Sequence, residues 1–205
     1  MSADGPVRRR GRPASAEKVA GEPATPERIL SSARAEFAER GYDRASVRAI
    51  ARGAGVDSAL VHHYFGTKEQ VFTAAVEGAF APAMGLPDLL LSGSREEWGA
   101  QLVGYIFQIW ENAVTRDPLL AIVRSAVNNE TAASIFRGLV GRNLLQRVAS
   151  GLDAPDAELR VELAVAQLVG TAILRYVIKL EPIASVPPEE LTVRLAPVVQ
   201  HHLTG

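Results

Sequence analysis

Two adjacent histidines, His62 and His63, stand in the segment DSALVHHYFGTKE (residues 57 to 69) and are the first candidates for chemistry in this chain. A helical zinc pair needs histidines four residues apart, whereas adjacent residues on a helix project about 100° from each other. The other histidines, His201 and His202, are also adjacent, and the sequence contains no cysteine. The supply of ligands therefore argues against a metal site, and we expect neither metal nor cofactor.

Common enzyme signatures do not occur in the sequence. It contains no Walker loop, no G-x-S-x-G elbow, no H-E-x-x-H motif, no dinucleotide fingerprint and no cysteine nucleophile. We therefore expect that the protein is not an enzyme.

The composition is typical of a soluble globular protein of one domain or two small ones, with 205 residues of which 47% are hydrophobic. The absence of cysteine fits a reducing compartment. The N-terminal arginines precede no apolar run, and the uncharged stretch from Leu163 to Leu174 is shorter than the roughly 20 residues of a membrane span. A cytoplasmic location without a membrane partner is expected.

Positive charge is concentrated near the N-terminus. Residues 1 to 70 contain 12 Lys+Arg against 9 Asp+Glu, a balance of +3, and the remainder has 10 against 14, a balance of −4. Residues 1 to 24 lack an apolar period, which predicts a flexible basic arm. Its RRRGRP sequence suits the minor groove of A·T-rich DNA, and a solvated tail is the alternative of equal weight. The candidate contacts of the arm are Arg8, Arg9, Arg10 and Arg12.

Three helices are predicted after residue 24, of which the second and third are short. Thr25 can cap the first, which ends at Gly41, and Ser46 is the N-cap expected for the second. Gly55 can adopt the positive φ of a tight turn, after which Asp57 caps the third helix.

The third helix needs only Val61 and Phe65 for its inward face. Its polar and aromatic side chains are left for solvent or a partner, because the packing face is narrow. A short helix presented after a glycine-containing turn is the arrangement of a helix-turn-helix DNA-binding unit.

Residues 25 to 72, TPERILSSARAEFAERGYDRASVRAIARGAGVDSALVHHYFGTKEQVF, resemble the DNA-binding domain of the tetracycline-repressor (TetR) family of transcriptional regulators. The matching features are Phe37, Gly41-Tyr42, Ser46-Val47, Ile50-Ala51, Gly55-Val56, Tyr64-Phe65, and Lys68 in GTKE. The resemblance implies an all-α homodimer of about nine helices, with an N-terminal three-helix helix-turn-helix domain and a C-terminal helical ligand-binding and dimerisation domain. The chain is accordingly divided into the arm (1–24), the DNA-binding domain (25–72) and the regulatory domain (73–205).

Two positions depart from the family pattern. Leu60 stands where the family often has threonine, and its apolar side chain suits a thymine methyl group. His62 stands where tyrosine is common, and its ring nitrogens can donate to a phosphate or accept from a base edge. The operator sequence therefore cannot be carried over from relatives.

Roles on DNA are assigned from these positions. Ser46 and Arg48, at the positive end of the second helix, are expected to hold a backbone phosphate, and Lys68 to hold another. Tyr64 is expected to touch the DNA backbone. A solvated polar helix face is the alternative. The full predicted DNA-binding set is Ser46, Arg48, Ser58, Ala59, Leu60, His62, His63, Tyr64 and Lys68.

Helices are also predicted throughout the C-terminal two thirds. One runs from the end of the DNA-binding domain to about Ala83, another covers 95 to 114, Asp117-Pro118 starts the next, and a further helix covers 131 to 150. The segment 157 to 180 is apolar nearly all round, so it must be buried on more than one side. By resemblance to the family, this segment and 189 to 203 pair with their copies in a four-helix dimer interface.

A ligand pocket is expected within residues 95 to 175, because polar side chains in apolar helices are costly unless they are paired. Arg124 and Arg175 would suit a carboxylate or phenolate, but each could instead pair with Glu111 or Glu130, or reach solvent. The candidate lining is Tyr105, Trp110, Arg124, Asn128, Phe136, Gln167, Thr171 and Arg175.

Together these features favour a cytoplasmic, dimeric repressor that binds a palindromic double-stranded DNA operator and is released by a small-molecule effector. The alternatives are an activator, a regulator without a small-molecule inducer, and a helical protein-interaction module.

Overall fold

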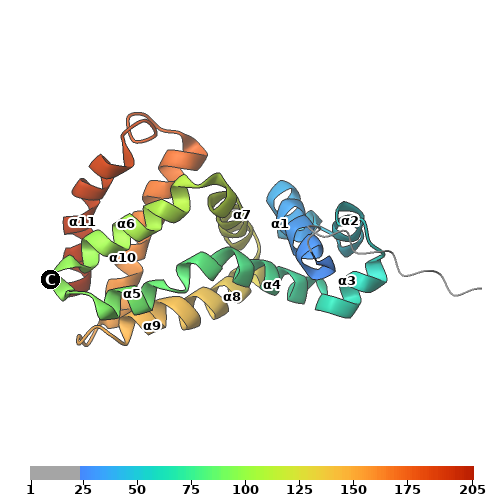
Figure 1. Ribbon diagram of the computed structural model, residues 1–205, viewed down its shortest axis with the longest axis horizontal. Helices are drawn as coiled ribbons and strands as arrows, with labels where there is room; N and C mark the ends of the chain where they lie inside the picture. The colour runs from blue at the N-terminus through green and yellow to red at the C-terminus, as the bar shows by residue number, and fades with distance from the viewer. Residues whose placement is uncertain (1–23) are drawn as a thin grey trace, which may run out of the picture.

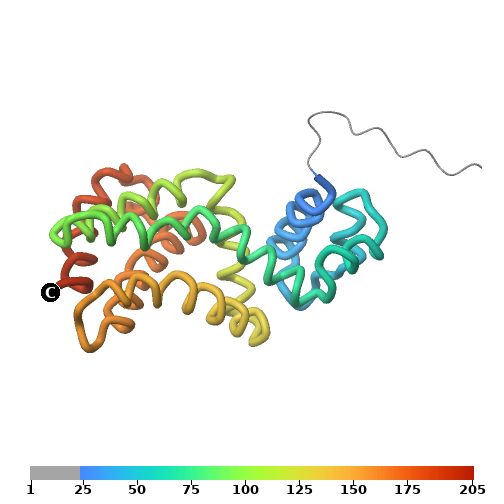
Figure 2. Tube along the Cα trace, turned by 60° about the horizontal axis from the view of Figure 1, so that its bottom comes forward, coloured from blue at the N-terminus to red at the C-terminus, as the bar shows by residue number. Residues whose placement is uncertain are grey.

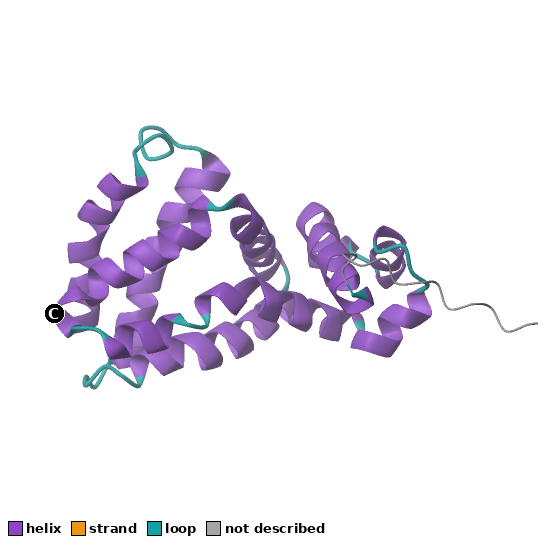
Figure 3. Ribbon diagram, viewed as in Figure 1, coloured by secondary structure: helices purple, strands orange, loops and turns teal. Residues whose placement is uncertain are grey.

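A computed structural model describes residues 24–205, which are helical and contain no strand within that range (Figure 3). The all-α prediction is confirmed. The arginines predicted as minor-groove contacts, Arg8, Arg9, Arg10 and Arg12, lie outside the described residues.

The N-terminal lobe is built from α1 (Thr25–Arg44), α2 (Val47–Gly53), α3 (Ser58–Phe65) and the first turns of α4 (Lys68–Phe80) (Figure 1). Its core contains an aromatic cluster in which Phe72 meets Phe37 and Tyr42 edge-on, with ring centroids 4.9 and 5.0 Å apart. Aromatic pairs in this geometry add to the stabilisation from burial alone. The cluster holds the end of α1 against α4, and α4 then continues into the second lobe (Figure 2).

The start and end of α1 differ slightly from expectation. Ala24, rather than Thr25, occupies the N-cap position, and no side chain caps the helix. Gly41 has φ of +70°, so regular helical geometry is interrupted there although the helix assignment extends to Arg44. The predicted break at Gly41 is thus confirmed, because glycine adopts positive φ without the steric cost of a Cβ atom.

The C-terminal lobe contains the remaining helices. They are η1 (Ala81–Ala83), α5 (Leu86–Ser92), η2 (Arg95–Glu97), α6 (Trp98–Glu111), α7 (Ala113–Asn128), α8 (Glu130–Phe136), η3 (Arg137–Leu145), α9 (Gln146–Ala149), α10 (Ala157–Ala172), η4 (Ile173–Ile178) and α11 (Pro188–Thr204). The segments η3 and η4 are π-helical and continue α8 and α10.

The start of α7 was predicted wrongly at Asp117-Pro118. The helix begins at Ala113, because the side-chain oxygen of Asn112 accepts a hydrogen bond of 2.9 Å from the Val114 amide. Pro118 therefore lies inside α7. The asparagine is the stronger start signal, since it satisfies an amide that the first turn leaves without a partner.

The start of α6 packs closely against the C-terminal half of α11 (Figure 1). A Cβ atom at Gly99 would lie 2.4 Å from the carbonyl oxygen of Ala196, so glycine is what permits this approach. The Gly99 amide also donates to the side-chain oxygen of Gln200 at 2.6 Å, and the Gln200 amide group donates to the Arg95 carbonyl at 2.7 Å. α11 is thereby fixed to the start of α6.

Two stretches, Lys68–Ser92 and Ala157–Ile178, are long and apolar enough to cross a membrane by length and composition. The first supplies Val71, Phe72 and Val76 to the core, where each is fully buried. The second leaves Leu159, Leu163 and Ile178 exposed. A surface like this on one chain marks a place where another apolar surface can pack.

Candidate nucleic-acid interface

The turn between α2 and α3 is held by local hydrogen bonds. The Ser46 hydroxyl accepts from the Ala49 amide at 3.2 Å, and the Asp57 carboxylate accepts from the Ala59 amide at 2.7 Å. Both predicted N-caps are confirmed, as is the positive φ of Gly55, which is +64°. The cap and turn residues thus set the direction in which α3 leaves α2.

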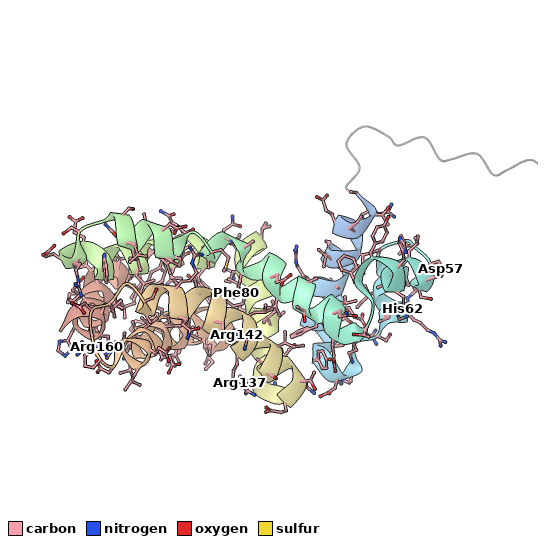
Figure 4. All side chains as sticks on the ribbon, turned by 90° about the horizontal axis from the view of Figure 1, so that it is seen from below. Asp57, His62, Phe80, Arg137, Arg142 and Arg160 are labelled. Carbon is pink, nitrogen blue, oxygen red and sulfur yellow. The ribbon has the colours of Figure 1, made fainter. Side chains whose placement is uncertain are left out.

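α3 buries one side and presents the other. Val61 is fully buried, and Phe65 is half-buried against the core. Leu60 and Tyr64 remain 39% and 45% exposed, and both histidines are exposed beside them. Figure 4 shows Asp57 and His62 at the end of the molecule farthest from the C-terminal lobe. The predicted groove-facing residues therefore lie where a large partner can reach them.

One ring nitrogen of His62 is already engaged. Its Nδ1 lies 2.8 Å from the carbonyl oxygen of Gly66. A carbonyl oxygen can only accept, so Nδ1 carries the proton in this contact. In the neutral ring, Nε2 is then the free nitrogen and offers an acceptor to a partner. The sequence left both nitrogens open, and the turn after α3 decides between them.

The residues expected to hold phosphates have different surroundings. Arg48 is exposed in the first turn of α2, close to Ser46. Lys68 is half-buried, donates to the Asp43 carbonyl at 3.0 Å and lies over the Tyr42 ring, with its Nζ 4.6 Å from the centroid. An ammonium group has three donors, so Lys68 retains two after bonding to Asp43. Of the remaining members of the set, Ala59 is exposed and Ser58 is half-buried.

The C-terminal lobe contains a cavity of about 490 Å³, within the usual size range of small-molecule sites. It lies among α6, α7, α8 with η3, and α10. Two residues of the predicted pocket, Trp110 and Phe136, line it. The other six do not line it: Tyr105, Arg124, Asn128, Gln167, Thr171 and Arg175.

Those six side chains have local partners or face solvent. The Tyr105 hydroxyl donates to the Pro82 carbonyl at 2.5 Å. Asn128 and Thr171 each donate at 2.8 Å to the carbonyl four residues earlier in their own helix. Arg124 and Gln167 are exposed. Polar residues in apolar helices predict a pocket only when they turn inward, and here Asn128 and Thr171 bond to their own helix while Arg124 and Gln167 are exposed.

Arg175 is buried and ties several elements together. Its guanidinium lies 3.0 Å from the Glu111 carboxylate, which is the ion pair that sequence reasoning had left open. Glu130, the other acid considered, instead pairs with Arg137 at 2.6 Å. Nη1 of Arg175 also donates to three carbonyls in the loop before α11, those of Ile183 (2.8 Å), Ala184 (3.1 Å) and Val186 (2.7 Å).

Tyr176 completes this cluster. Its hydroxyl donates to Glu111 at 2.6 Å, and its ring stacks on Trp110 with centroids 6.2 Å apart. Burial, followed by the hydrogen bond to Glu111, raises the pKa of Tyr176 to about 12. Burial lowers the pKa of Arg175, but the hydrogen bonds to Tyr176 and Glu111 outweigh it and the pKa is raised. The cluster thus connects the cavity wall at Trp110 with the loop that leads to α11.

Among residues 24–205, no three His, Asp or Glu side chains come together so as to hold a metal ion.

Comparison with known proteins agrees with the two-lobe organisation. Residues 29–75 match the model of the bacterial regulatory proteins of the tetR family. Residues 96–203 match the tetracyclin repressor-like C-terminal domain. The chain belongs to the TetR family. The family predicted from residues 25 to 72 is therefore confirmed by a match that extends over most of the chain.

Three relatives illustrate the similarity. A TetR-family regulator from Streptomyces coelicolor A3 is 36% identical, with 88% of this chain and 95% of that chain covered and a TM-score of 0.67. A transcriptional regulator from Rhodococcus sp. Rha1 is 25% identical, with 88% and 96% covered and a TM-score of 0.62. The HTH-type transcriptional regulator BetI of Rhizobium meliloti (strain 1021) is 39% identical over 59 residues, which span 29% of this chain and 29% of BetI.

Proposed function

We propose that this TetR-family protein is a homodimeric repressor that binds a palindromic DNA operator and is released from it by a small molecule. The observation that carries the proposal is the exposed face of α3. Leu60, His62, His63 and Tyr64 remain exposed there, while Val61 is the fully buried residue of α3. An apolar group beside hydrogen-bonding rings suits base edges in a major groove.

Dimerisation is supported by apolar surface that one chain leaves uncovered. Leu159 and Leu163 on α10, with Val193 and Val198 on α11, are between 42% and 73% exposed. Burying such residues against a second copy removes their apolar area from water. A twofold axis through these helices presents two copies of α3, and half-sites about 34 to 36 Å apart, or a multiple of that distance, match one DNA turn.

Release by a ligand requires that the cavity and α3 communicate. The cavity is lined by Val123 and Val127 of α7 and by Phe136 of α8. α7 also packs against α1 of the DNA-binding lobe and against α4, which runs from that lobe into the C-terminal lobe. A ligand that favours a different α7 position would therefore shift the population of lobe orientations and weaken operator binding.

The cytoplasm, where the chromosome lies, is the proposed location.

The function is tested by selecting fragments from a random DNA pool with the purified full-length protein at near-physiological salt. Enrichment of a palindrome whose half-sites lie one helical turn or a multiple apart is expected. Equal retention of all sequences, or an enriched site without twofold symmetry, would contradict the proposal. Repeating the selection without residues 1 to 24 tests the basic arm, whose loss should weaken sites flanked by A·T pairs.

The dimer is tested by Leu163→Glu, which places a charge on the exposed apolar face of α10. Light scattering should show the mass of a single chain, and operator affinity should fall with it. Val114→Glu is the matched control, because Val114 is 82% exposed at the start of α7 and lies outside the proposed interface. A dimeric Leu163→Glu protein would place the interface elsewhere.

A further inference from the structure

Among the described residues, 24–205, the cavity wall contains a single ionisable side chain. The residues that line it come from η1, α4 to α10 and η3, and all are apolar except Glu162. Trp110 and Phe136 supply aromatic surface. Transferring a charged or unpaired polar group into such surroundings is strongly unfavourable. The enclosed part of a ligand must therefore be hydrocarbon or aromatic.

Glu162 marks the mouth of this cavity. It is exposed, and it also borders a smaller polar depression of about 200 Å³ that contains Arg142 and Glu158. Leu145 and Glu162 line both spaces, so they separate the apolar interior from the polar rim. A ligand group at this boundary therefore meets the carboxylate of Glu162.

The helical spacing of α10 explains the position of Glu162. Val161, Val165 and Leu168 follow one another at spacings of four and three and point into the cavity. Glu162 lies one residue beyond this stripe, on its flank, while Leu163 lies on the outer apolar face. The carboxylate can thus reach the cavity mouth while its charge remains hydrated in the empty protein.

Several neighbouring groups at the rim have partners of their own. Arg137 pairs with Glu130 at 2.6 Å, and the Gln146 side chain donates to Glu158 at 3.2 Å. Arg142 borders only the depression and not the cavity; Figure 4 shows it with Arg137 on η3. The group that a ligand held in the cavity meets is therefore the acid.

We propose that the cavity binds an apolar molecule carrying one amine, with the hydrocarbon body inside and the ammonium group paired with Glu162. The Coulomb term favours a cation at this position and disfavours a carboxylate. This is the opposite of the sequence-based expectation, in which Arg124 and Arg175 would attract an anion, because neither arginine lines the cavity. The proposal deepens the proposed function, and it rests on that function only for the consequence at the operator.

The test uses three probes that share one alkyl chain: decylamine, decanol and decanoate. Each is titrated below its micellar concentration into the full-length protein without DNA, and binding is measured by isothermal titration calorimetry. Decylamine is expected to bind most tightly, and decanoate at least about tenfold more weakly than decylamine. Equal affinity for decanoate and decylamine, or no binding of decylamine, would overturn the proposal.

Variants locate the charge and the cavity. Glu162→Gln should weaken decylamine about fivefold and leave decanol within about twofold, because a partly exposed ion pair contributes modestly. Glu158→Gln is the matched control, since Glu158 borders the depression but not the cavity, and it should change neither probe. Val123→Phe, which narrows the cavity, should weaken all three probes. Unchanged decylamine affinity in Glu162→Gln would also overturn the proposal.

A separate gel-shift measurement on the ligand-free protein keeps the two proposals distinguishable. If the protein binds its operator but does not prefer decylamine, only the proposed ligand class is contradicted. If the protein binds decylamine but shows no sequence preference on DNA, the proposed regulatory function is contradicted and the proposed amine site is not.

Discussion

The side-chain amide of Asn129 donates a hydrogen bond of 2.6 Å to the carboxylate of Asp43. Asn129 is also the N-cap of α8, where its oxygen accepts from the Ala132 amide at 2.9 Å. It follows α7 directly, so it stands between two helices that line the cavity. Asp43 lies at the end of α1, and its backbone carbonyl accepts from Lys68. One hydrogen bond thus joins the regulatory lobe to the DNA-binding lobe.

We expect Asn129→Ser to weaken the communication between the lobes. Serine can still cap α8, but its side chain is too short to reach Asp43 at the same time. The measurement is the operator affinity with and without decylamine, and the ratio of the two gives the coupling free energy. In the variant this coupling free energy should be smaller than in the wild type by about 1 kcal/mol. The affinity for decylamine itself should change little. Asn112→Ser is the control, because Asn112 caps α7 in the same way. Equal coupling in both variants and the wild type would show that the contact does not transmit ligand binding.

Arg48→Ala is expected to weaken binding to all DNA sequences to a similar degree. Arg48 is exposed at the positive end of α2, where it can neutralise a phosphate. The slope of log affinity against log salt should become shallower by about one, because one fewer counterion is released. Fluorescence anisotropy over a salt series measures this slope. Arg147→Ala, on α9, removes the same charge from the other lobe and should leave the slope unchanged.

Leu60→Thr and His62→Ala should change which sequences are preferred rather than the overall affinity. Leu60 offers an apolar contact to a thymine methyl group, and the free Nε2 of neutral His62 offers an acceptor. Each substitution should relax or alter the base preference at one position in each half-site. The free-energy difference between the preferred base and the others at that position should change by about 1 to 3 kcal/mol. DNA selections performed in parallel with the wild type measure the change. Identical enriched sites in all three proteins would show that α3 does not read those bases.

Tyr176→Phe should reduce the alkaline loss of stability. Between pH 10, the ordinary pKa of tyrosine, and about 12, the pKa of Tyr176 in the folded protein, the unfolded chain loses the phenol proton while the folded chain keeps it. The free energy of unfolding therefore falls as pH rises through this window, and is unaffected by this group below it. Urea unfolding at pH 9 and pH 11 should show a smaller fall in the variant.

The comparison with the wild type isolates Tyr176. Burial also raises the pKa of Tyr42, but that residue is present in both proteins and its contribution cancels. At pH 8 the variant should be less stable by about 1 kcal/mol, because the hydrogen bond to Glu111 is lost. An equal fall in stability between pH 9 and pH 11 in both proteins would contradict the assigned origin of the shift.

Much of the DNA-binding lobe could be read from the sequence, because its decisive interactions are local. Ser46 and Asp57 cap helices through amides two or three residues away, and Gly55 needs only its own φ. Val61 lies inward through the period of its own helix. Pro118 misled the prediction of α7 because a local signal six residues earlier, at Asn112, was stronger.

The sequence by itself determined the family, the all-α fold class and the direction in which α3 is presented, since caps, turns and helical period act over a few residues. The tertiary structure decided which polar side chains have hydrogen-bond or ion-pair partners and which residues line the cavity. Arg175 meets Glu111 across 64 positions, and Asn129 meets Asp43 across 86. Among residues 24–205, Glu162 is the one charged side chain of the cavity wall because helices far apart in the chain pack together there. Side-chain chemistry alone does not encode which neighbours packing will supply.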